Sequence, residues 1–286
     1  MESVSKRVGV SPGVGGKQLY RFPTMTAFWT KEIESTRSNE PDSLSLDSVI
    51  PDSLIDSLIH VGNPARELMR KLTLGVFRYI HSRSRSYEIA VAGKWFTVPP
   101  GVFTPCYRNV LSTKASELLA TNLKVPVGGR VLDLGTGTGI QGIFAADRAS
   151  AVVATDINPD ATRCAAQNAR NNGVTNLETR TGDLFEPVEG ERFDLIVWLP
   201  PAFFVDPENV AERAFACGRR GETLVRFCRR AADHLAEGGF IQFSCVDRTR
   251  QFILHHLALN GFRYEQITMV RRLPMETCTQ YLAWHR

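Results

Sequence analysis

Three glycines at alternate positions, Gly135, Gly137 and Gly139, follow a short apolar run that begins at Val131. A run of this length is typical of a strand that is covered on both faces, and a helix is predicted over 141–148, directly after the glycines. Glycine lets the backbone turn sharply close to a ligand, and the free N–H groups of a helix start point toward that ligand. The segment therefore predicts a strand, a binding loop and a helix.

Two acids flank this loop. Asp133 lies two residues before Gly135, where a carboxylate would attract an ammonium group and repel a pyrophosphate. Ile140 stands where a dinucleotide-binding G-x-G-x-x-G loop would have its last glycine. A second apolar run, 151–156, ends in Asp156, which is placed to accept both hydroxyls of a ribose. The acids favour a ligand that contains a ribose and an amine. The alternatives are that the glycine segment is an ordinary turn without a ligand and that Asp156 is a solvated acid at the end of a strand.

Two further segments follow in order, Gly182-Asp-Leu-Phe-Glu-Pro187 and Phe193-Asp-Leu-Ile-Val-Trp-Leu-Pro-Pro201. Together with the glycine loop and Asp156 they resemble class I S-adenosylmethionine (SAM) dependent methyltransferases. They are most similar to the small-domain branch, which includes the glutamine methyltransferases of release factors and certain ribosomal RNA guanine methyltransferases. The resemblance extends over about 98–286 and implies SAM as the cofactor.

The resemblance also implies which residues hold this cofactor. The acid of the Gly-Asp-Leu-Phe segment, Asp183, is expected to contact the adenine amino group. The expected cofactor-binding residues are Asp133, Gly135, Thr136, Gly137, Gly139, Asp156, Ile157, Asp183, Leu184 and Leu199.

The acceptor motif of the branch is altered in this chain. In amino-methylating members an Asn-Pro-Pro-Tyr (or Phe) segment orients the acceptor through the Asn oxygen and the aromatic ring. Here the corresponding residues are Leu199-Pro200-Pro201-Ala202, so a hydrogen-bond acceptor and a ring are both missing. Pro200 and Pro201 keep the backbone shape and are the expected positioning residues, and no general base is assigned. We therefore expect a changed acceptor.

The sequence favours a small-molecule acceptor in specialised biosynthesis, methylated by in-line displacement at the sulfonium. A nucleic-acid partner is not expected. Asp206 and Glu208 follow the motif and are candidates for taking up a proton. The expected substrate-binding residues are mostly aromatic and near the motif: Phe103, Tyr107, Trp198, Phe203 and Phe204.

Three alternatives stay open. Protein or RNA N-methylation is favoured by the arginine pairs at 219–220, 229–230 and 271–272. A second alternative is reaction at the aminobutyrate chain of SAM, with release of methylthioadenosine. The third is a SAM-binding subunit without catalysis.

Composition limits the class of protein. The chain has 286 residues, 43% of them hydrophobic, and a formal charge of +4, which is too small to indicate nucleic-acid binding. Six cysteines without a C-x-x-C pair predict reduced thiols in a cytoplasmic protein, without a metal site. No run is long enough to predict a membrane span, and the sequence indicates no oligomeric state.

The order of predicted elements indicates an α/β fold. The resemblance implies a seven-stranded, Rossmann-like class I methyltransferase three-layer sandwich with an N-terminal helical subdomain and a β-hairpin. We expect a mobile segment or active-site lid over 1–45, a helical subdomain over 46–86 and the SAM-binding domain over 87–286. In that domain, 87–105 form the hairpin and lead-in, and helices are predicted over 206–217 and 222–235.

Overall fold

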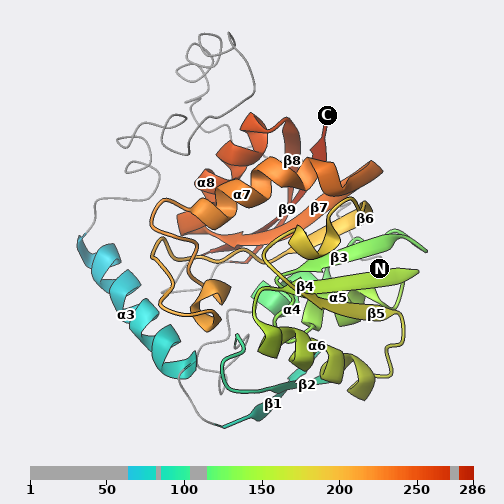
Figure 1. Ribbon diagram of the computed structural model, residues 1–286. Helices are drawn as coiled ribbons and strands as arrows, with labels where there is room; N and C mark the ends of the chain where they lie inside the picture. Colours follow the sequence, from blue (N-terminus) through green and yellow to red (C-terminus); the bar gives the residue numbers. More distant parts are fainter. Residues whose placement is uncertain (1–63, 82–84, 104–114, 271–276) are drawn as a thin grey trace, which may run out of the picture. The chain divides into compact units, whose positions relative to one another are not determined.

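The computed structural model describes residues 64–81, 85–103, 115–270 and 277–286 (Figure 1). The predicted N-terminal segment over 1–45 lies outside the described residues. The same is true of the first part of the predicted helical subdomain and of Tyr107.

A seven-stranded sheet with the order β5-β4-β3-β6-β7-β9-β8 forms the centre of the structure (Figure 1). The strands from β5 to β7 run parallel, and β9 is antiparallel to both of its neighbours. The fold class is therefore confirmed. The strands are β3 Arg130–Leu134, β4 Ala151–Asp156, β5 Leu177–Thr181, β6 Phe193–Trp198, β7 Leu235–Val246, β8 Phe262–Val270 and β9 Cys278–His285.

Helices cover both faces of the sheet. In Figure 1, α4, α5 and α6 lie on one side and α7 and α8 on the other. Successive strand residues therefore enter different cores: Val131 packs with residues near α4 and α5, and Leu132 packs with residues of α7 and α8. The helices are α4 Ala115–Thr121, α5 Ile140–Ala145, α6 Pro159–Asn171, α7 Glu222–Arg230 and α8 Asp247–Leu259, with the 3₁₀ turns η2 Glu186–Val188, η3 Ala211–Ala214 and η4 Ala231–His234.

The predicted hairpin is formed by β1 (Tyr87–Val91) and β2 (Lys94–Val98). Ala92 and Gly93 make the two-residue turn, with φ values of 44° and 85°. The buried Asn168 of α6 ties β2 to the sheet domain, because it pairs with both the N–H and the C=O of Thr97, at 2.9 and 3.0 Å. It also donates to the Thr138 carbonyl at 2.9 Å, so it links the hairpin to the glycine loop.

The helix predicted over 206–217 is wrong. Only η3 forms there, and the chain instead folds back so that Phe203 and Ala216 form a parallel bridge. Phe203 N donates to the Phe215 carbonyl at 2.8 Å, and Cys217 N donates to the Phe203 carbonyl at 2.9 Å. These non-local bonds satisfy backbone groups that a helix would have paired locally.

Candidate active site

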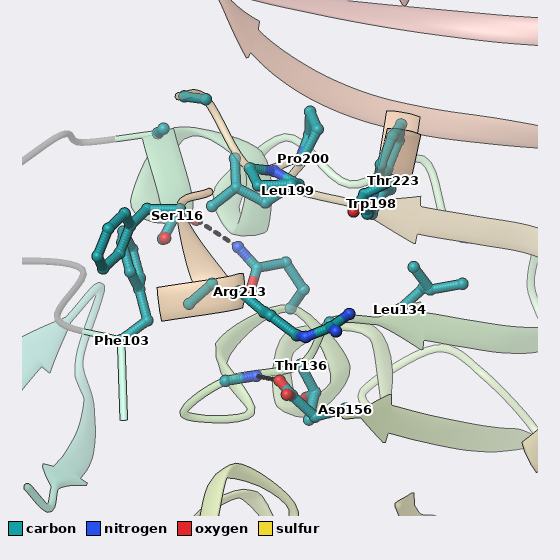
Figure 2. Close-up of a pocket in the computed structure, with 18 of the residues that line it drawn as sticks. Phe103, Ser116, Leu134, Thr136, Asp156, Trp198, Leu199, Pro200, Arg213 and Thr223 are labelled. Atoms are coloured by element: carbon teal, nitrogen blue, oxygen red, sulfur yellow. Dashed lines mark hydrogen bonds between the residues drawn. The ribbon is translucent and has the colours of Figure 1, made fainter. Parts of the chain in front are cut away.

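A cavity of about 250 Å³ lies where the parallel strands end (Figure 2). Leu134, Asp156 and Trp198 are the last residues of β3, β4 and β6, and all three line it. After β3 the chain forms β4 on one side of it and β5 beyond that, and then forms β6 on the other side of β3. Ligands of such sheets bind at this switch point.

The glycine loop forms one wall. Gly135 and Gly137 have φ values of 72° and 55°, a conformation that favours glycine. A Cβ atom built on either residue would meet no protein atom within 4 Å. The loop is held by the Thr155 carbonyl, which accepts from Gly135 N and Thr136 N, each at 2.8 Å. The loop therefore leaves open space beside its backbone that a ligand can fill.

Gly139 has a different role from the other two glycines. Its φ is 85°, and a Cβ there would lie 3.1 Å from Ala165 of α6. The residue therefore allows α5 and α6 to approach each other, and it is not among the residues that line the cavity. The structure does not bring it to the place expected for a cofactor-binding residue.

Asp133 lies buried beneath the loop, 2% exposed. Its Oδ2 accepts from Thr136 Oγ1 at 2.6 Å and from Gly142 N at 2.8 Å. Burial raises the pKa of this carboxyl to about 6, although the two hydrogen bonds lower it, and the nearby charge of Asp156 adds to the increase. Asp133 thus fixes the loop and the first turn of α5, and it brings negative charge to the cavity wall.

Asp156 is the acid at the tip of β4. Its Oδ2 accepts from Gly137 N and its Oδ1 from Asn158 N, each at 2.9 Å. Burial raises its pKa, and the backbone hydrogen bonds oppose that increase. Because each carboxylate oxygen can accept more than one hydrogen bond, both oxygens keep acceptor capacity toward the cavity.

Thr155 was missed by the sequence analysis. Its side chain is 1% exposed and lines the cavity, and its Oγ1 has no hydrogen-bond partner among the described residues. This Oγ1 is itself enclosed by protein atoms, so Thr155 contributes to the cavity wall and is not assigned to a ligand. The only available signal was its place one residue before Asp156. The open space at Gly135 and Gly137 and the acceptor capacity of Asp156 fit an adenosyl ligand with polar ribose hydroxyls.

The next wall is the segment after β5. Leu184 has φ 49°, an uncommon value for a residue with a side chain, and both Asp183 and Leu184 line the cavity. Asp183 Oδ2 accepts from Arg226 Nη1 at 2.9 Å, and Arg213 Nη1 lies 3.9 Å away. One oxygen of the expected adenine-binding acid is therefore already paired with arginine.

The end of β6 forms the opposite wall. Leu199, Pro200 and Pro201 line the cavity, as expected for the altered motif. Trp198 also lines it and stacks on Phe227 with ring centroids 3.6 Å apart. This wall is mostly apolar and fixed by packing.

Of the other expected substrate residues, Phe103 and Phe203 line the cavity. Phe203 is 2% exposed, and the Arg248 guanidinium lies 4.2 Å from its ring centroid. Phe204 does not line the cavity; its ring packs edge-on against Phe252, with centroids 5.2 Å apart, inside the core near α7 and α8.

The segment 202–217 brings cavity residues that the sequence analysis missed. Arg213 and Phe215 line the cavity, and in Figure 2 the Arg213 side chain extends between Pro200 and Thr136. The helix predicted over 206–217 gave no reason to place this arginine at the cavity. The further missed lining residues are Ala115, Ser116, Leu134, Thr138, Gln141, Gly182, Ala202, Ala214, Thr223, Ser244, Cys245, Val246, Arg248 and Cys278.

Asp206 and Glu208 are not at the cavity. Asp206 Oδ2 lies 2.7 Å from Arg219 Nε, and Glu208 Oε1 lies 2.8 Å from Arg78 Nη2. Both carboxylates are therefore engaged in surface ion pairs, and the idea that either takes up a proton from the acceptor is wrong.

Other site types can be assessed for the part of the chain that the structure describes. There, no group of three or more His, Cys, Asp or Glu side chains is arranged to hold a metal ion. None of the cysteines among these residues is in a disulfide: Cys164, Cys217, Cys228, Cys245 and Cys278. No helix in the described ranges has both the length and the apolar character needed to cross a membrane.

Comparison with known proteins places this cavity in a family. The family model described as the methyltransferase small domain matches residues 94–251, which include both walls of the cavity from the glycine loop to Arg248. The chain belongs to the methyltransferase small-domain family. It is a class I SAM-dependent methyltransferase, and SAM is its cofactor.

Three relatives show which methyltransferases this chain is similar to. A Methanocaldococcus jannaschii protein described as an N5-glutamine methyltransferase is 32% identical over 203 residues, which are 68% of this chain and 98% of the relative. The release factor glutamine methyltransferase of Aquifex aeolicus is 32% identical over 62% of this chain and 69% of its own length. The tRNA1(Val) (adenine(37)-N6)-methyltransferase of Actinobacillus pleuropneumoniae is 33% identical over 40% of this chain and 50% of its own length.

A solved structure of a methyltransferase complexed with SAH (S-adenosylhomocysteine) shares the fold. Its TM-score is 0.51 and its sequence identity 15%, over 70% of this chain and 56% of that one.

The names of these relatives contradict the predicted class of methyl acceptor. By name they act on proteins or tRNA, so the prediction of a small-molecule substrate in specialised metabolism, without a nucleic-acid partner, is wrong. That prediction relied on the missing acceptor groups at Leu199 and Ala202, on the apolar residues expected around them and on the small net charge. All four residues of the altered motif line the cavity, so the change of two side chains does not by itself define the class of acceptor.

Proposed function

We propose that this methyltransferase modifies a protein side chain, with SAM held on the glycine loop. The observation that carries the proposal is the match to the Methanocaldococcus jannaschii protein, described as an N5-glutamine methyltransferase, over 98% of that protein's length. The named Aquifex aeolicus relative modifies release factor. A component of the translation machinery is therefore the proposed substrate class.

The cofactor is assigned to the residues that fit it. Asp156 would accept hydrogen bonds from the ribose hydroxyls through its remaining acceptor capacity. Asp133 supplies negative charge toward the ammonium group of the amino acid part. Gly135 and Gly137 leave the space that the cofactor fills. Bound SAM supplies a methyl group that is already electrophilic because it is attached to a sulfonium.

The chain then has to align the acceptor and exclude water. Trp198, Leu199 and Phe203 form an apolar wall at the end of β6, and Phe215 closes it from the segment 202–217. Such alignment in a dry site is the main requirement for methyl transfer. Because Leu199 cannot accept a hydrogen bond, we assign the orientation of the acceptor to other polar groups of the cavity, among them Gln141.

A transfer assay tests this function. The chain is incubated with SAM carrying a tritiated methyl group and, separately, with purified release factors, ribosomal proteins and total tRNA. We expect label in a protein fraction, removed by protease and resistant to ribonuclease, and a mass increase of one methyl group on one peptide. The Asp156→Asn variant is expected to lose the label, while the surface variant Asp160→Asn keeps it.

RNA methylation is the second candidate, favoured by the tRNA-modifying relative. Label in tRNA that ribonuclease removes would replace the protein proposal by this one. Binding of SAM without transfer to any of the three fractions would refute both.

We also propose that the protein works in the cytoplasm. A substrate of the translation machinery is consistent with that compartment, and none of the described cysteines is in a disulfide, as is usual for proteins in a reducing environment.

A further inference from the structure

The segment 202–217, here termed the acceptor loop, has an outgoing limb at 202–203 and a returning limb at 213–217, and the two limbs hydrogen-bond to each other. Ala202 N and Phe203 N both donate to the Phe215 carbonyl, at 3.0 and 2.8 Å, and Phe203 also bridges Ala216. The returning limb carries Arg213, Ala214 and Phe215 to the cavity wall. The position of this limb therefore decides the shape of the acceptor side of the cavity.

Glu212 anchors the turn of the acceptor loop. Its side chain is nearly buried, 9% exposed, and its Oε2 accepts from Glu208 N at 3.1 Å. Its own N–H donates to Asn209 Oδ1 at 3.1 Å. A buried carboxylate needs a charged partner, and this one comes from a distant part of the chain.

That partner is Arg78 of helix α3 (Pro64–His81). Arg78 Nη2 donates to Glu212 Oε2 at 3.1 Å, and its Nε lies 3.0 Å from Oε1. The same guanidinium pairs with Glu208 at 2.8 Å. One arginine thus contacts two carboxylates of the loop, in the forked geometry that arginine provides.

Two neighbours of Arg78 on α3 contact the same region. Leu74, one turn before it, packs against the cluster of Phe203, Phe215 and Ala216. The His81 ring, near the end of the helix, lies 5.2 Å from the ring of Phe215 and 5.3 Å from that of Phe103. This face of α3 therefore contacts aromatic residues from two sides of the cavity.

We infer that Arg78 is a positioning residue for methyl transfer: through Glu212 it holds the acceptor loop against the cavity. The inference rests on the proposed function, because the loop is assigned there to the acceptor. Arg78 itself is not among the residues that line the cavity. Its loss should therefore impair the acceptor side and leave the cofactor side, which is built on β3 and β4, intact.

Hydrogen–deuterium exchange of the full chain tests this without any acceptor. In Arg78→Ala, we expect the amides of Phe203, Phe215 and Cys217 to exchange at least about tenfold faster, the effect of a loss of about 1.4 kcal/mol in local stability. The Gly137 amide, bonded to Asp156, should exchange at the wild-type rate. Lys71→Ala, an exposed position on the same helix, is the matched control and should change neither region.

Rescue separates a specific pair from general damage. The conservative variant Arg78→Lys keeps a positive charge beside Glu212 and Glu208 and is expected to give slower loop exchange than Arg78→Ala. Calorimetry should give the same SAM affinity for wild type, Arg78→Ala and Arg78→Lys. With the protein substrate found by the transfer assay, Arg78→Ala should raise the acceptor KM more than it lowers kcat.

Wild-type loop exchange in Arg78→Ala would overturn the inference, as would loop exchange in Arg78→Lys that is no slower than in Arg78→Ala. A parallel loss of SAM affinity in Arg78→Ala would also overturn it, since the effect would then be global. Failure of the proposed function shows separately, as the absence of label in protein from the wild-type chain.

Discussion

Replacing Asp156 by Asn changes the two atoms on which the cofactor assignment depends most. Each carboxylate oxygen accepts one backbone N–H, from Gly137 and from Asn158, each at 2.9 Å. Asparagine has one oxygen, so its NH₂ group must face one of these donors. A hydrogen bond to a charged group contributes about 1.5–3 kcal/mol. We therefore expect the SAM dissociation constant to rise about 10- to 100-fold.

Isothermal titration calorimetry of SAM into the full chain measures this change. The matched control is Asp160→Asn, because Asp160 is an exposed acid in the first turn of α6 whose side chain pairs with Arg163 and does not line the cavity. It should bind SAM like the wild type. An Asp156→Asn affinity within about threefold of wild type would refute the reasoning that this carboxylate holds the ribose.

Three more results are expected. Gly137→Ala should weaken SAM binding about tenfold because its Cβ enters the cavity. Gly128→Ala, whose φ of 71° also lies in the left-handed region, should not; calorimetry compares the two variants. Lowering the pH from 7.5 to 5 should raise the free energy of unfolding of the wild type, relative to Asp133→Asn, by about 1 kcal/mol in urea titrations. The sign follows because burial raises the pKa to about 6, so the folded state binds the proton more tightly. Asn168→Ala should lower that free energy by about 2–4 kcal/mol, because three hydrogen bonds of this buried side chain are lost, and unchanged stability would contradict its linking role.

The cofactor half of the site could be predicted from the sequence because its determinants are local. The glycine loop, Asp133 and the strand-end Asp156 lie within 24 residues of one another, and their types reflect backbone conformation and charge. The hairpin was predictable for the same reason, since Ala92-Gly93 fixes its turn. The seven-stranded, Rossmann-like fold was predicted from the family resemblance, which the whole set of motifs carried.

The acceptor half could not be predicted because its determinants are distant contacts. Arg78 and Glu212 are 134 positions apart, and Arg226 and Asp183 are 43 apart. The acceptor loop has a local pattern that suggests a helix, yet bonds between its two limbs override it. Leu199 and Ala202 were given too much weight for the substrate, because side chains from other segments also form the wall.

The most direct test of the central claim is a crystal structure of the full chain grown with S-adenosylhomocysteine. The account predicts the ribose hydroxyls on the Asp156 carboxylate, the adenosyl group against Gly135 and Gly137, and the sulfur facing the wall formed by Leu199 and Pro200. A ligand bound elsewhere, or with its ribose away from Asp156, would contradict it.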